Sequence, residues 1–360
     1  MKLALHRGVT KTGYGTFGDG LERGLRAAGV EVVGPDDPAP CLLYALPPHF
    51  YPGKRVDQRA WCFAMWEADG CPEGLRAGFG NFEGLIVPTP TNLAALSQWH
   101  PNVHLVPLAV DWQFWTPRPR KLDGTFRFLY TKHSPTRKGG DLAEAAVEKL
   151  KRDGYDVELV PATHPTDEGL RDLFWSAHAY LQPSRGEGWG MMPHQALASG
   201  MPVVISDCPG HREYGWLPGC YLTKTVRVPS KLCFHGDPGY WWEPDPVDLV
   251  QTMRTVIDGY GEAHAAAQQA WEECRDLFDW GQVAAQIVAL MGDAMSGPDA
   301  VGEWVAAEFE KYPATPVRDV DAQIGRVRYR LRAGEEVLLP ADAKRVLVKS
   351  GAIVESGWAA

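Results

Sequence analysis

The residues of this 360-residue chain that are best placed to do chemistry surround one acid, Glu187. It lies in the glycine-spaced run Gly186–Gly190, where glycines can adopt positive φ and let a ligand approach the backbone closely. A helix is predicted soon after this run, and the N-terminus of a helix attracts anionic groups. An acid in an open turn beside a helix N-terminus therefore predicts a ligand-binding site.

The elements that must position this turn are short and apolar. Ala179–Leu181 is predicted to be a strand that stops at Pro183. Pro193 suits the first turn of a helix, and Gly200 is a typical residue just after a helix C-terminus. Pro202–Ser206 is predicted to be a second buried strand. The stretch is therefore a βαβ unit with the acid in its turn.

This unit resembles the C-terminal signature of the retaining glycosyltransferases of family 4, which have the GT-B fold. The matching residues are Glu187, Gly188, Trp189, Gly190, Ala196, Leu197, Ala198, Gly200, Pro202 and Val203. The sequence departs from the signature at Gln195, where the family has a second glutamate. A pattern of this length is much more specific than a short glycine motif.

The resemblance implies two catalytic residues. Glu187 would contact the hydroxyls of the donor sugar. Lys138 matches a lysine that binds the donor diphosphate, and a cation suits this place because the leaving diphosphate gains negative charge as the sugar bond breaks. The family also has an arginine about five residues earlier, where this chain has Lys132 and His133. Arg137 is the alternative for that role.

The remaining donor-binding residues are also implied by the resemblance. The amides of Gly188–Gly190 would hold the far edge of the sugar, and Gln195 would lie at the nucleotide ribose. A glycine-rich loop after the first strand would cover the diphosphate. The whole set of donor-binding residues is Gly13, Tyr14, Gly15, Lys132, His133, Arg137, Gly188, Trp189, Gly190, Met191 and Gln195.

The glycine-rich segment near the N-terminus has a second interpretation. The residues 13–18 match the G-x-G-x-x-G pattern of dinucleotide-binding folds, and Asp36 lies at a suitable distance for a ribose acid. Against this interpretation, residues 8–12 separate the first strand from the first glycine, whereas the fingerprint needs a tight turn there. We expect a loop over Gly8–Gly15 and a helix from about Phe17 to Ala28.

The segment Trp66–Gly74 resembles a bacterial and phage subgroup of the same family, in which it lies on the N-terminal domain at the cleft. The resemblance places Trp66, Glu67 and Asp69 on the acceptor side, where Glu67 would orient an acceptor hydroxyl. The alternative is a loop at a strand end that packs around Trp66. Both interpretations stay open at this point.

The resemblance implies an α/β protein with the GT-B fold, in which two Rossmann-like domains face a cleft. We expect residues 1–115 to form the acceptor-side domain and residues 125–295 to form the nucleotide-sugar-binding domain, with a last helix that crosses back. Residues 296–360 lie outside the resemblance. They are predicted to form a small β-rich appendage.

The appendage is predicted to contain a helix over Asp299–Tyr312 and a strand over Arg326–Arg332, whose alternation puts four arginines on one face. Glu335–Leu339 and Val346–Val354 are further predicted strands, and Pro340 is a predicted helix start. The arginines are either a solvated face that protects an edge strand or a docking face for an anionic acceptor. The amino-acid sequence of this segment resembles short add-on segments of phage-encoded proteins.

Composition limits the classes of partner and compartment. The net charge of −9 argues against non-specific attraction to nucleic acid or to anionic lipid. The seven cysteines form no C-x-x-C pair, which is typical of free thiols in a reducing compartment. The sequence has no recognisable signal peptide and no run of about 20 apolar residues. We therefore expect a cytoplasmic protein, in the host cytoplasm if it is encoded by a phage.

The resemblance implies transfer of a hexose-type sugar from a nucleoside-diphosphate sugar to an acceptor hydroxyl, with retention at the anomeric carbon. The acceptor stays open between a saccharide, a modified DNA base and a protein side chain. No metal or other cofactor is expected, because cations and a helix N-terminus can supply the electrostatic stabilisation. Three other functions stay open: a nucleotide-sugar epimerase, a catalytically inactive sugar-nucleotide-binding module and a NAD-dependent dehydrogenase.

Overall fold

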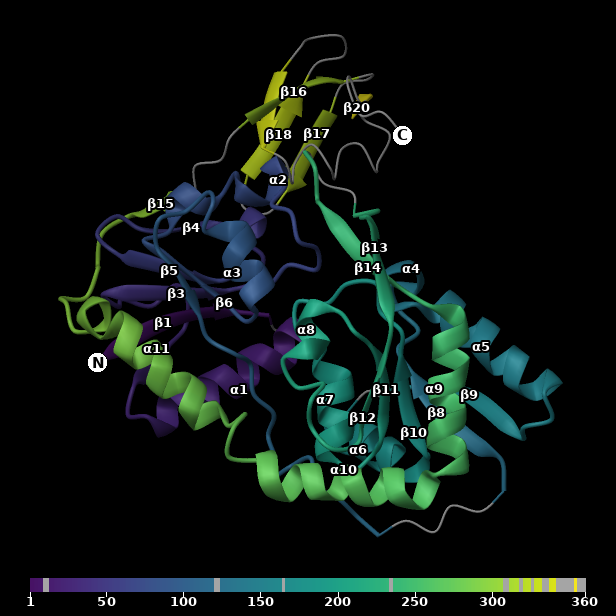
Figure 1. The fold of residues 1–360 in the computed structure, drawn as a ribbon. Coiled ribbons are helices and arrows are strands. Elements are labelled where there is room, and N and C mark those ends of the chain that lie inside the picture. The colour runs from purple at the N-terminus through teal and green to yellow at the C-terminus, as the bar shows by residue number, and fades with distance from the viewer. Residues whose placement is uncertain are drawn as a thin grey trace.

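Two parallel β-sheets, each accompanied by helices, form most of the molecule, and a smaller group of antiparallel strands lies at one end (Figure 1). The structure is a computed structural model. It describes residues 1–8, 13–119, 124–163, 166–232, 236–306, 311–316, 320–324, 327–331, 337–340 and 353–354.

The first sheet has six strands in the order β2-β1-β3-β5-β6-β7, all parallel. Its strands are β1 (Lys2–Arg7), β2 (Glu31–Val33), β3 (Cys41–Ala45), β5 (Arg59–Phe63), β6 (Gly84–Val87) and β7 (Val103–Leu105). The central strand β3 is buried along its whole length, as expected for a strand covered on both faces. Helix α1 (Gly13–Ala27) packs on β1 and β2, and α3 (Pro90–Leu96) packs on β6 and β7.

The second sheet has five parallel strands in the order β12-β11-β10-β8-β9. Its strands are β8 (Phe126–Tyr130), β9 (Val157–Pro161), β10 (Ala179–Gln182), β11 (Val203–Ser206) and β12 (Cys220–Thr223). The helices of this half are α4 (Pro135–Lys138), α5 (Gly140–Arg152), α6 (Asp167–Ser176), α7 (Met191–Ala198), α8 (Pro209–Arg212) and α9 (Pro246–Asp258). The βαβ unit predicted around Glu187 is present as β10, α7 and β11.

The chain returns to the first half through α10 (Tyr260–Cys274) and α11 (Trp280–Met295), and α11 packs against α1 (Figure 1). The segment between α10 and α11 also contacts residues 110–112, which belong to the first of the two segments that join the halves. Phe278 accepts hydrogen bonds through its carbonyl from Val110 N at 2.9 Å and from Trp112 Nε1 at 3.2 Å. The two chain crossings therefore contact each other, and together they are called the hinge below.

The glycine-rich segment after β1 is helical, so the prediction of a loop over Gly8–Gly15 is wrong for its last three residues. Helix α1 begins at Gly13, and residues 9–12 lie outside the described residues. A Cβ at Gly20 would lie 2.1 Å from the Trp280 ring, so α11 can approach α1 only because this position has no side chain. The dinucleotide fingerprint needs its glycines in a tight turn, and here they lie inside a helix.

A β-hairpin leaves the second half and extends toward the first (Figure 1). Its strands are β13 (Thr225–Pro229) and β14 (Tyr240–Pro244), which pair in antiparallel fashion. The sequence predicts an aromatic loop over Cys233–Glu243, and this is wrong from Tyr240 onward because cross-strand pairing with β13 orders the segment. Residues 233–235 lie outside the described residues.

The C-terminal strands pair in small antiparallel groups. Strand β15 (Trp304–Ala306) joins β4 (Gly53–Arg55), while β16 (Lys311–Pro316) joins β19 (Val337–Pro340) and β20 (Ile353–Val354). The predicted helix over Asp299–Tyr312 is wrong, because pairing of β15 with a distant strand overrides local helical propensity. The remaining short elements are the 3₁₀ turns Pro48–Phe50 and Phe79–Asn81 and the helix α2 (Glu73–Arg76).

The alternating arginine segment forms a strand, as predicted, over its described part. Strand β18 (Val327–Leu331) pairs with β17 (Val320–Ile324) as a hairpin. The strand predicted over Glu335–Leu339 corresponds to β19. The predicted helix start after Pro340 lies outside the described residues, as does most of the strand predicted over Val346–Val354.

Candidate active site

Two cations lie on a short helical turn directly after the first strand of the second sheet. Arg137 and Lys138 belong to α4, which is a separate turn and not the opening of α5. Ser134 before α4 has φ 53° and Gly139 after it has φ 69°. The left-handed conformation is uncommon for a serine, and such backbone strain is found preferentially at functional sites.

Glu187 is 5% exposed, and four side chains surround its carboxylate. Lys138 Nζ lies 2.7 Å from Oε1, and Arg137 Nη1 lies 3.4 Å from Oε2. Gln182 Nε2 and Ser184 Oγ donate hydrogen bonds to Oε1 at 2.9 and 2.7 Å. Burial alone would raise the pKa of Glu187, but Lys138 and Arg137 outweigh it and lower the pKa to about 2. Glu187 is therefore a buried, ionised carboxylate at neutral pH.

Burial and the nearby carboxylates shift the pKa values of Lys138 and Arg137 in opposite directions. Burial lowers the pKa of Lys138, and Glu187 opposes that shift. Burial also disfavours the charge of Arg137, but Glu67 and Glu187 outweigh it and raise the pKa of Arg137. A carboxylate from each half of the molecule therefore contributes to holding the guanidinium charged.

The structure favours Arg137 over Lys132 as the second cation of this cluster. Arg137 Nη1 donates a 3.0 Å hydrogen bond to the carbonyl of Gly186, next to Glu187, whereas Lys132 is exposed. The pKa of His133 is lowered by burial and by the nearby Lys138 and Arg137, so His133 is neutral at pH 7.

Two aromatic residues that the sequence did not indicate contact the glycine turn after Glu187 at Gly190. Gly190 has φ 94° and precedes α7, and its carbonyl accepts a 2.9 Å hydrogen bond from the Tyr214 hydroxyl. A Cβ at Gly190 would lie 2.7 Å from the His211 ring and 2.7 Å from the Tyr214 hydroxyl oxygen, so glycine is required there. The pair lies on α8 and just after it, a segment whose aromatic spacing gave no local signal of this role.

The Trp189 side chain is a core residue. It is 2% exposed, and its Nε1 donates a 3.2 Å hydrogen bond to Nδ1 of His194. Burial lowers the pKa of His194 to about 3, so this imidazole stays neutral and can accept that bond. Because the side chain is buried, Trp189 can take part in donor binding only through its backbone amide.

Gln195 and Met191 line a cavity of about 220 Å³ between the two halves. Gln195 is 3% exposed and belongs to α7, while Thr16 and Asp19 reach the same cavity from α1. The Glu187 cluster does not line this cavity. The expected ribose-binding residue and the expected sugar-binding residue are thus separated by the glycine turn.

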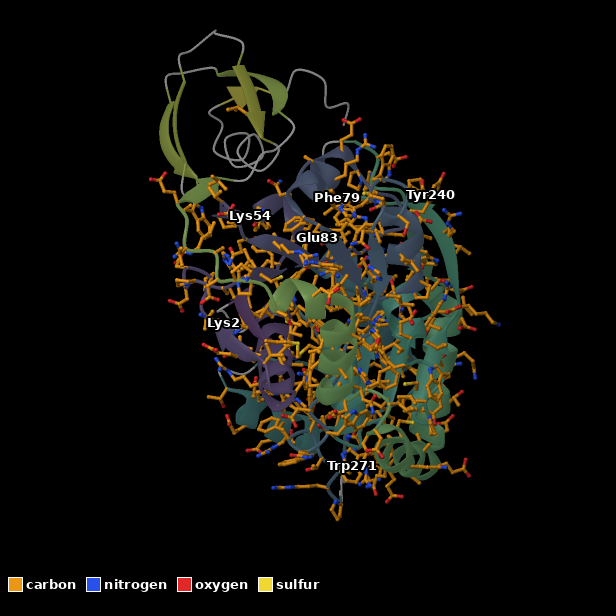
Figure 2. The ribbon with its side chains drawn as sticks, turned by 90° about the vertical axis from the view of Figure 1, so that its left-hand side faces the viewer. Lys2, Lys54, Phe79, Glu83, Tyr240 and Trp271 are labelled. Atoms are coloured by element: carbon orange, nitrogen blue, oxygen red, sulfur yellow. The ribbon has the colours of Figure 1, made fainter. Side chains whose placement is uncertain are left out.

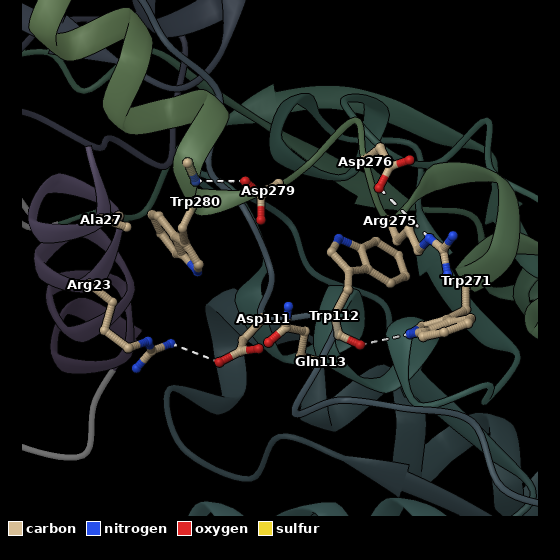
Figure 3. A pocket seen from close by; sticks show the side chains of 12 residues that line it. Arg23, Ala27, Asp111, Trp112, Gln113, Trp271, Arg275, Asp276, Asp279 and Trp280 are labelled. Carbon is tan, nitrogen blue, oxygen red and sulfur yellow. Dashed lines mark hydrogen bonds and ion pairs between the residues drawn. The ribbon is translucent and has the colours of Figure 1, made fainter. Parts of the chain in front are cut away.

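A larger cavity of about 590 Å³ lies at the hinge (Figure 3). It is lined by Trp112, Trp271 and Trp280 together with charged residues such as Arg23 and Asp111, which form a 3.0 Å ion pair. No residue of the Glu187 cluster lines it. This cavity belongs to the packing between α1 and the two chain crossings.

The acceptor-side residues predicted from the sequence divide into three roles. Glu67 faces the cations, with Oε1 3.8 Å from Arg137 Nη2. Trp66 is 3% exposed, and both its backbone N–H and its carbonyl are hydrogen-bonded to the Asn92 side chain. Trp66 therefore has a structural role in this loop. Asp69 accepts a 2.7 Å hydrogen bond from the Tyr240 amide and pairs with an arginine of the same hairpin.

The N-terminal helix also reaches this cluster. The hydroxyl of Tyr14 donates a 3.3 Å hydrogen bond to the carbonyl of Met65, and burial followed by the charge of Glu67 raises its pKa far above the usual range. Tyr14 is therefore a neutral phenol beside Glu67. Gly13 and Gly15 lie in the first turn of α1.

The described ranges contain no group of three or more histidine, cysteine, aspartate or glutamate side chains that could hold a metal ion. Among the helices described, none is both long and apolar enough to cross a bilayer.

Residues 137–258 match the family described as Glycosyl transferases group 1. The chain is 23% identical to an MMP alpha-(1->4)-mannosyltransferase of Mycolicibacterium hassiacum over 54% of its own length, and it spans only 49% of that relative. It is also 23% identical to a protein of a Sulfolobus islandicus filamentous virus assigned as glycosyltransferase 45, over 70% of this chain and 83% of the viral protein.

The fold is similar to that of a solved sucrose-phosphate synthase from Thermosynechococcus elongatus. The TM-score is 0.55 at 15% identity, and the match covers 81% of this chain and 98% of the other. Because the identity is low, this similarity concerns the arrangement of the two halves and not their substrates.

Proposed function

We propose that this chain, which has the GT-B fold and carries a glycosyl transferases group 1 domain at residues 137–258, transfers a sugar from a nucleoside-diphosphate sugar to an acceptor hydroxyl with retention. The observation that supports this most is the contact of Lys138 and Arg137 with the buried Glu187. Two cations and a carboxylate suit a ligand that joins a diphosphate to a sugar.

In the proposed reaction the bond between the anomeric carbon and the diphosphate oxygen breaks, and its electron pair leaves with the diphosphate. The acceptor oxygen forms the new bond on the same face, and its proton passes to an oxygen of the departing phosphate. Lys138 and Arg137 would stabilise the charge that accumulates on the diphosphate. Their positions are fixed before the reaction, so little reorganisation is needed as charge develops.

Glu187 would accept hydrogen bonds from the sugar hydroxyls. Its low pKa, which results from Lys138 and Arg137 outweighing the effect of burial, keeps it an acceptor at neutral pH. An incoming diphosphate competes with Glu187 for the ammonium of Lys138. We therefore propose that donor binding shifts Lys138 toward the phosphates and leaves Glu187 to the sugar.

The nucleoside would lie toward the 220 Å³ cavity that contains Gln195 and Met191. A carboxylamide offers one acceptor and one pair of donors to a ribose diol, where a glutamate offers two charged acceptor atoms. Ribose binding by Gln195 would therefore be weaker than by a glutamate. No metal is part of this proposal, because the two cations supply the charge stabilisation.

The acceptor would approach from the first half, where Glu67 and Tyr14 face the cations. The acceptor class remains a hydroxyl group on a saccharide, a modified DNA base or a protein side chain. The viral relative supports testing phage-related acceptors alongside saccharides.

A panel of UDP-, GDP-, ADP- and TDP-sugars tests the proposal. A ligand at about 100 times its dissociation constant should add about 2.7 kcal/mol to the stability of the folded chain, so thermal shift identifies the donor. The identified donor should then lose its nucleoside diphosphate slowly in water and faster with an acceptor, in buffer that contains EDTA. No shift and no release with any donor would contradict the proposal.

A further inference from the structure

The β13–β14 hairpin is attached to the second half but is held by the first. The carboxylate of Asp69 accepts hydrogen bonds from the Arg227 guanidinium and from the Tyr240 amide. The amide of Asp69 donates in return to the Tyr240 carbonyl at 3.3 Å, and Gly70 N donates to Pro238 O at 3.2 Å. The loop after β5 is thus joined to the hairpin by backbone and side-chain bonds.

The hairpin also inserts an aromatic side chain into the first half. Trp241 is 3% exposed and belongs to the hydrophobic cluster that contains Tyr44, Trp66 and Leu75. Val228, on the neighbouring strand, packs against the same cluster. Burial of a large aromatic ring contributes strongly to the stability of an interface, so the hairpin is anchored and does not merely touch the first half.

The anchor lies directly beside the candidate active site. A Cβ at Gly186 would lie 2.0 Å from the carbonyl oxygen of Glu67 and 3.0 Å from Nε1 of Trp241. Glycine is therefore required where the Glu67 loop, the hairpin and the turn before Glu187 meet. Within the described part of the chain, Trp241 Nε1 is buried without a hydrogen-bond partner.

The base of the hairpin is tied to the donor side. Trp242 N donates a 2.8 Å hydrogen bond to the carbonyl of Arg185, and Arg185 forms ion pairs with Glu243 and Asp141. Arg185 is two residues before Glu187, and Asp141 lies in the first turn of α5, three residues after Lys138. The hairpin therefore connects the residues around both Lys138 and Glu187 to the loop that carries Glu67.

The hairpin lies far from the hinge. Figure 2 shows Tyr240 in the upper part of the main body, below the C-terminal strands, and Trp271, which lines the hinge cavity, at the bottom. Motion of the halves about the hinge would change the distance between the Glu67 loop and the Gly186 turn most at the hairpin end. A connection placed there resists that motion more effectively than one placed at the hinge.

We infer that the β13–β14 hairpin is a strap that positions the Glu67 loop against the Glu187 turn, with Arg227 and Asp69 as positioning residues for sugar transfer. The inference rests on the proposed function for its catalytic part. It gives Asp69 a role through the hairpin in place of the direct acceptor contact expected from the sequence. Small misplacements of reacting groups reduce rates strongly, so loosening the strap should affect transfer more than donor binding.

The test uses the full chain with Arg227→Met, which keeps the length of the side chain and removes its charge. The matched control is Arg254→Met, because Arg254 pairs with Asp153 entirely within the second half. The rescue variant is Arg227→Lys. Hydrogen exchange is measured without ligand on peptides that cover residues 66–75 and 236–242, together with the hinge peptide 275–285.

Exchange at the two strap peptides should be faster by roughly threefold in Arg227→Met, because their amides bond across the strap and a partly exposed ion pair contributes less than about 1 kcal/mol, while the hinge peptide and Arg254→Met stay unchanged. With the identified donor, the ratio of transfer to hydrolysis should fall by roughly threefold or more, and binding of UDP or GDP should not change. Arg227→Lys should restore both readouts in part.

Unchanged exchange in Arg227→Met would overturn the strap. Faster exchange with an unchanged ratio of transfer to hydrolysis would overturn the positioning role and leave only a structural connection. If no donor is cleaved by the unaltered chain, the proposed function fails, and the exchange comparison still decides whether the hairpin ties the two halves together.

Discussion

Lys138 Nζ lies 2.7 Å from Glu187 Oε1, so the residue expected to bind the diphosphate is held by the residue expected to bind the sugar. Both side chains are at most 10% exposed. Such a buried pair is costly to break on one side, because the remaining charge is left without compensation. The pair therefore links the stability of the chain to its proposed chemistry.

Lys138→Ala should lower both turnover and stability. Turnover should fall by roughly 10²-fold or more, as loss of one preorganised charge-stabilising group does in other enzymes. The free energy of unfolding should fall by about 3 kcal/mol, the lower end for removal of one partner of a buried pair, because Arg137 still faces Glu187. Nucleoside diphosphate release and urea denaturation measure the two effects.

Lys151→Ala is the matched control for that variant. Lys151 pairs with Glu148 on the surface of α5 at 2.8 Å, in the same half and outside the cluster. Surface pairs contribute little, so this variant should keep both turnover and denaturation midpoint. Equal loss in the two variants, or no loss in either, would contradict the role assigned to Lys138.

Glu187→Gln should reduce the loss of folding stability that occurs as the pH falls. Lys138 and Arg137 outweigh burial and lower the pKa of Glu187 to about 2, from an ordinary value of 4.5. A carboxylate with a depressed pKa in the folded state contributes stability above its unfolded pKa, and that contribution is lost as pH falls through the folded pKa. The unaltered chain should therefore lose stability between about pH 4.5 and pH 2, and the variant should lose less over this interval.

The buried histidines lower stability in acid with the same sign, over an interval that begins at higher pH and overlaps that of Glu187. Burial lowers the pKa of His194 to about 3 and of His211 to about 4, so protonation favours the unfolded chain as pH falls below 6.5. Urea midpoints measured from pH 7 to pH 2.5 separate the groups, because Glu187→Gln leaves the loss between pH 6.5 and pH 4.5 in place. An identical pH profile in variant and parent would contradict the ionised state of Glu187.

Gln195→Glu should tighten nucleotide binding by about 1 kcal/mol, or roughly fivefold, because a charged acceptor replaces a neutral one at the ribose. Titration of UDP and GDP by calorimetry measures this change. Gln98→Glu, at an exposed position just after the end of α3, is the control and should have no effect. A neutral or harmful result at Gln195 alone would mean that this side chain does not face the ribose.

The βαβ unit around Glu187 could be predicted because its signals are local. The apolar strand at Ala179, the glycines of the turn and Gly200 with φ 72° act within a few residues of where they stand. The pairing of Lys138 with Glu187 could be expected only from the family resemblance, since about fifty residues separate them. Nothing in the local pattern of Tyr214 and His211 indicates that they hold the turn at Gly190.

Two of the failed predictions share one physical cause, which is pairing between distant segments. Trp304–Ala306 was predicted to lie in a helix but pairs with β4 as strand β15. Tyr240 was expected in a loop and lies in a strand. Long-range strand pairing overrides local propensity, and periodicity within one segment does not encode its partner.

The central claim, sugar transfer with retention at the Glu187 and Lys138 cluster, is tested most directly by following the anomeric carbon. The donor identified by thermal shift is prepared with ¹³C at that carbon and incubated with acceptor and EDTA, and the product is examined by NMR. The account predicts a new glycosidic bond with the configuration of the donor, formed far more slowly by Lys138→Ala. Inversion at that carbon, isomerisation of the donor without acceptor, or full dependence on added metal would contradict it.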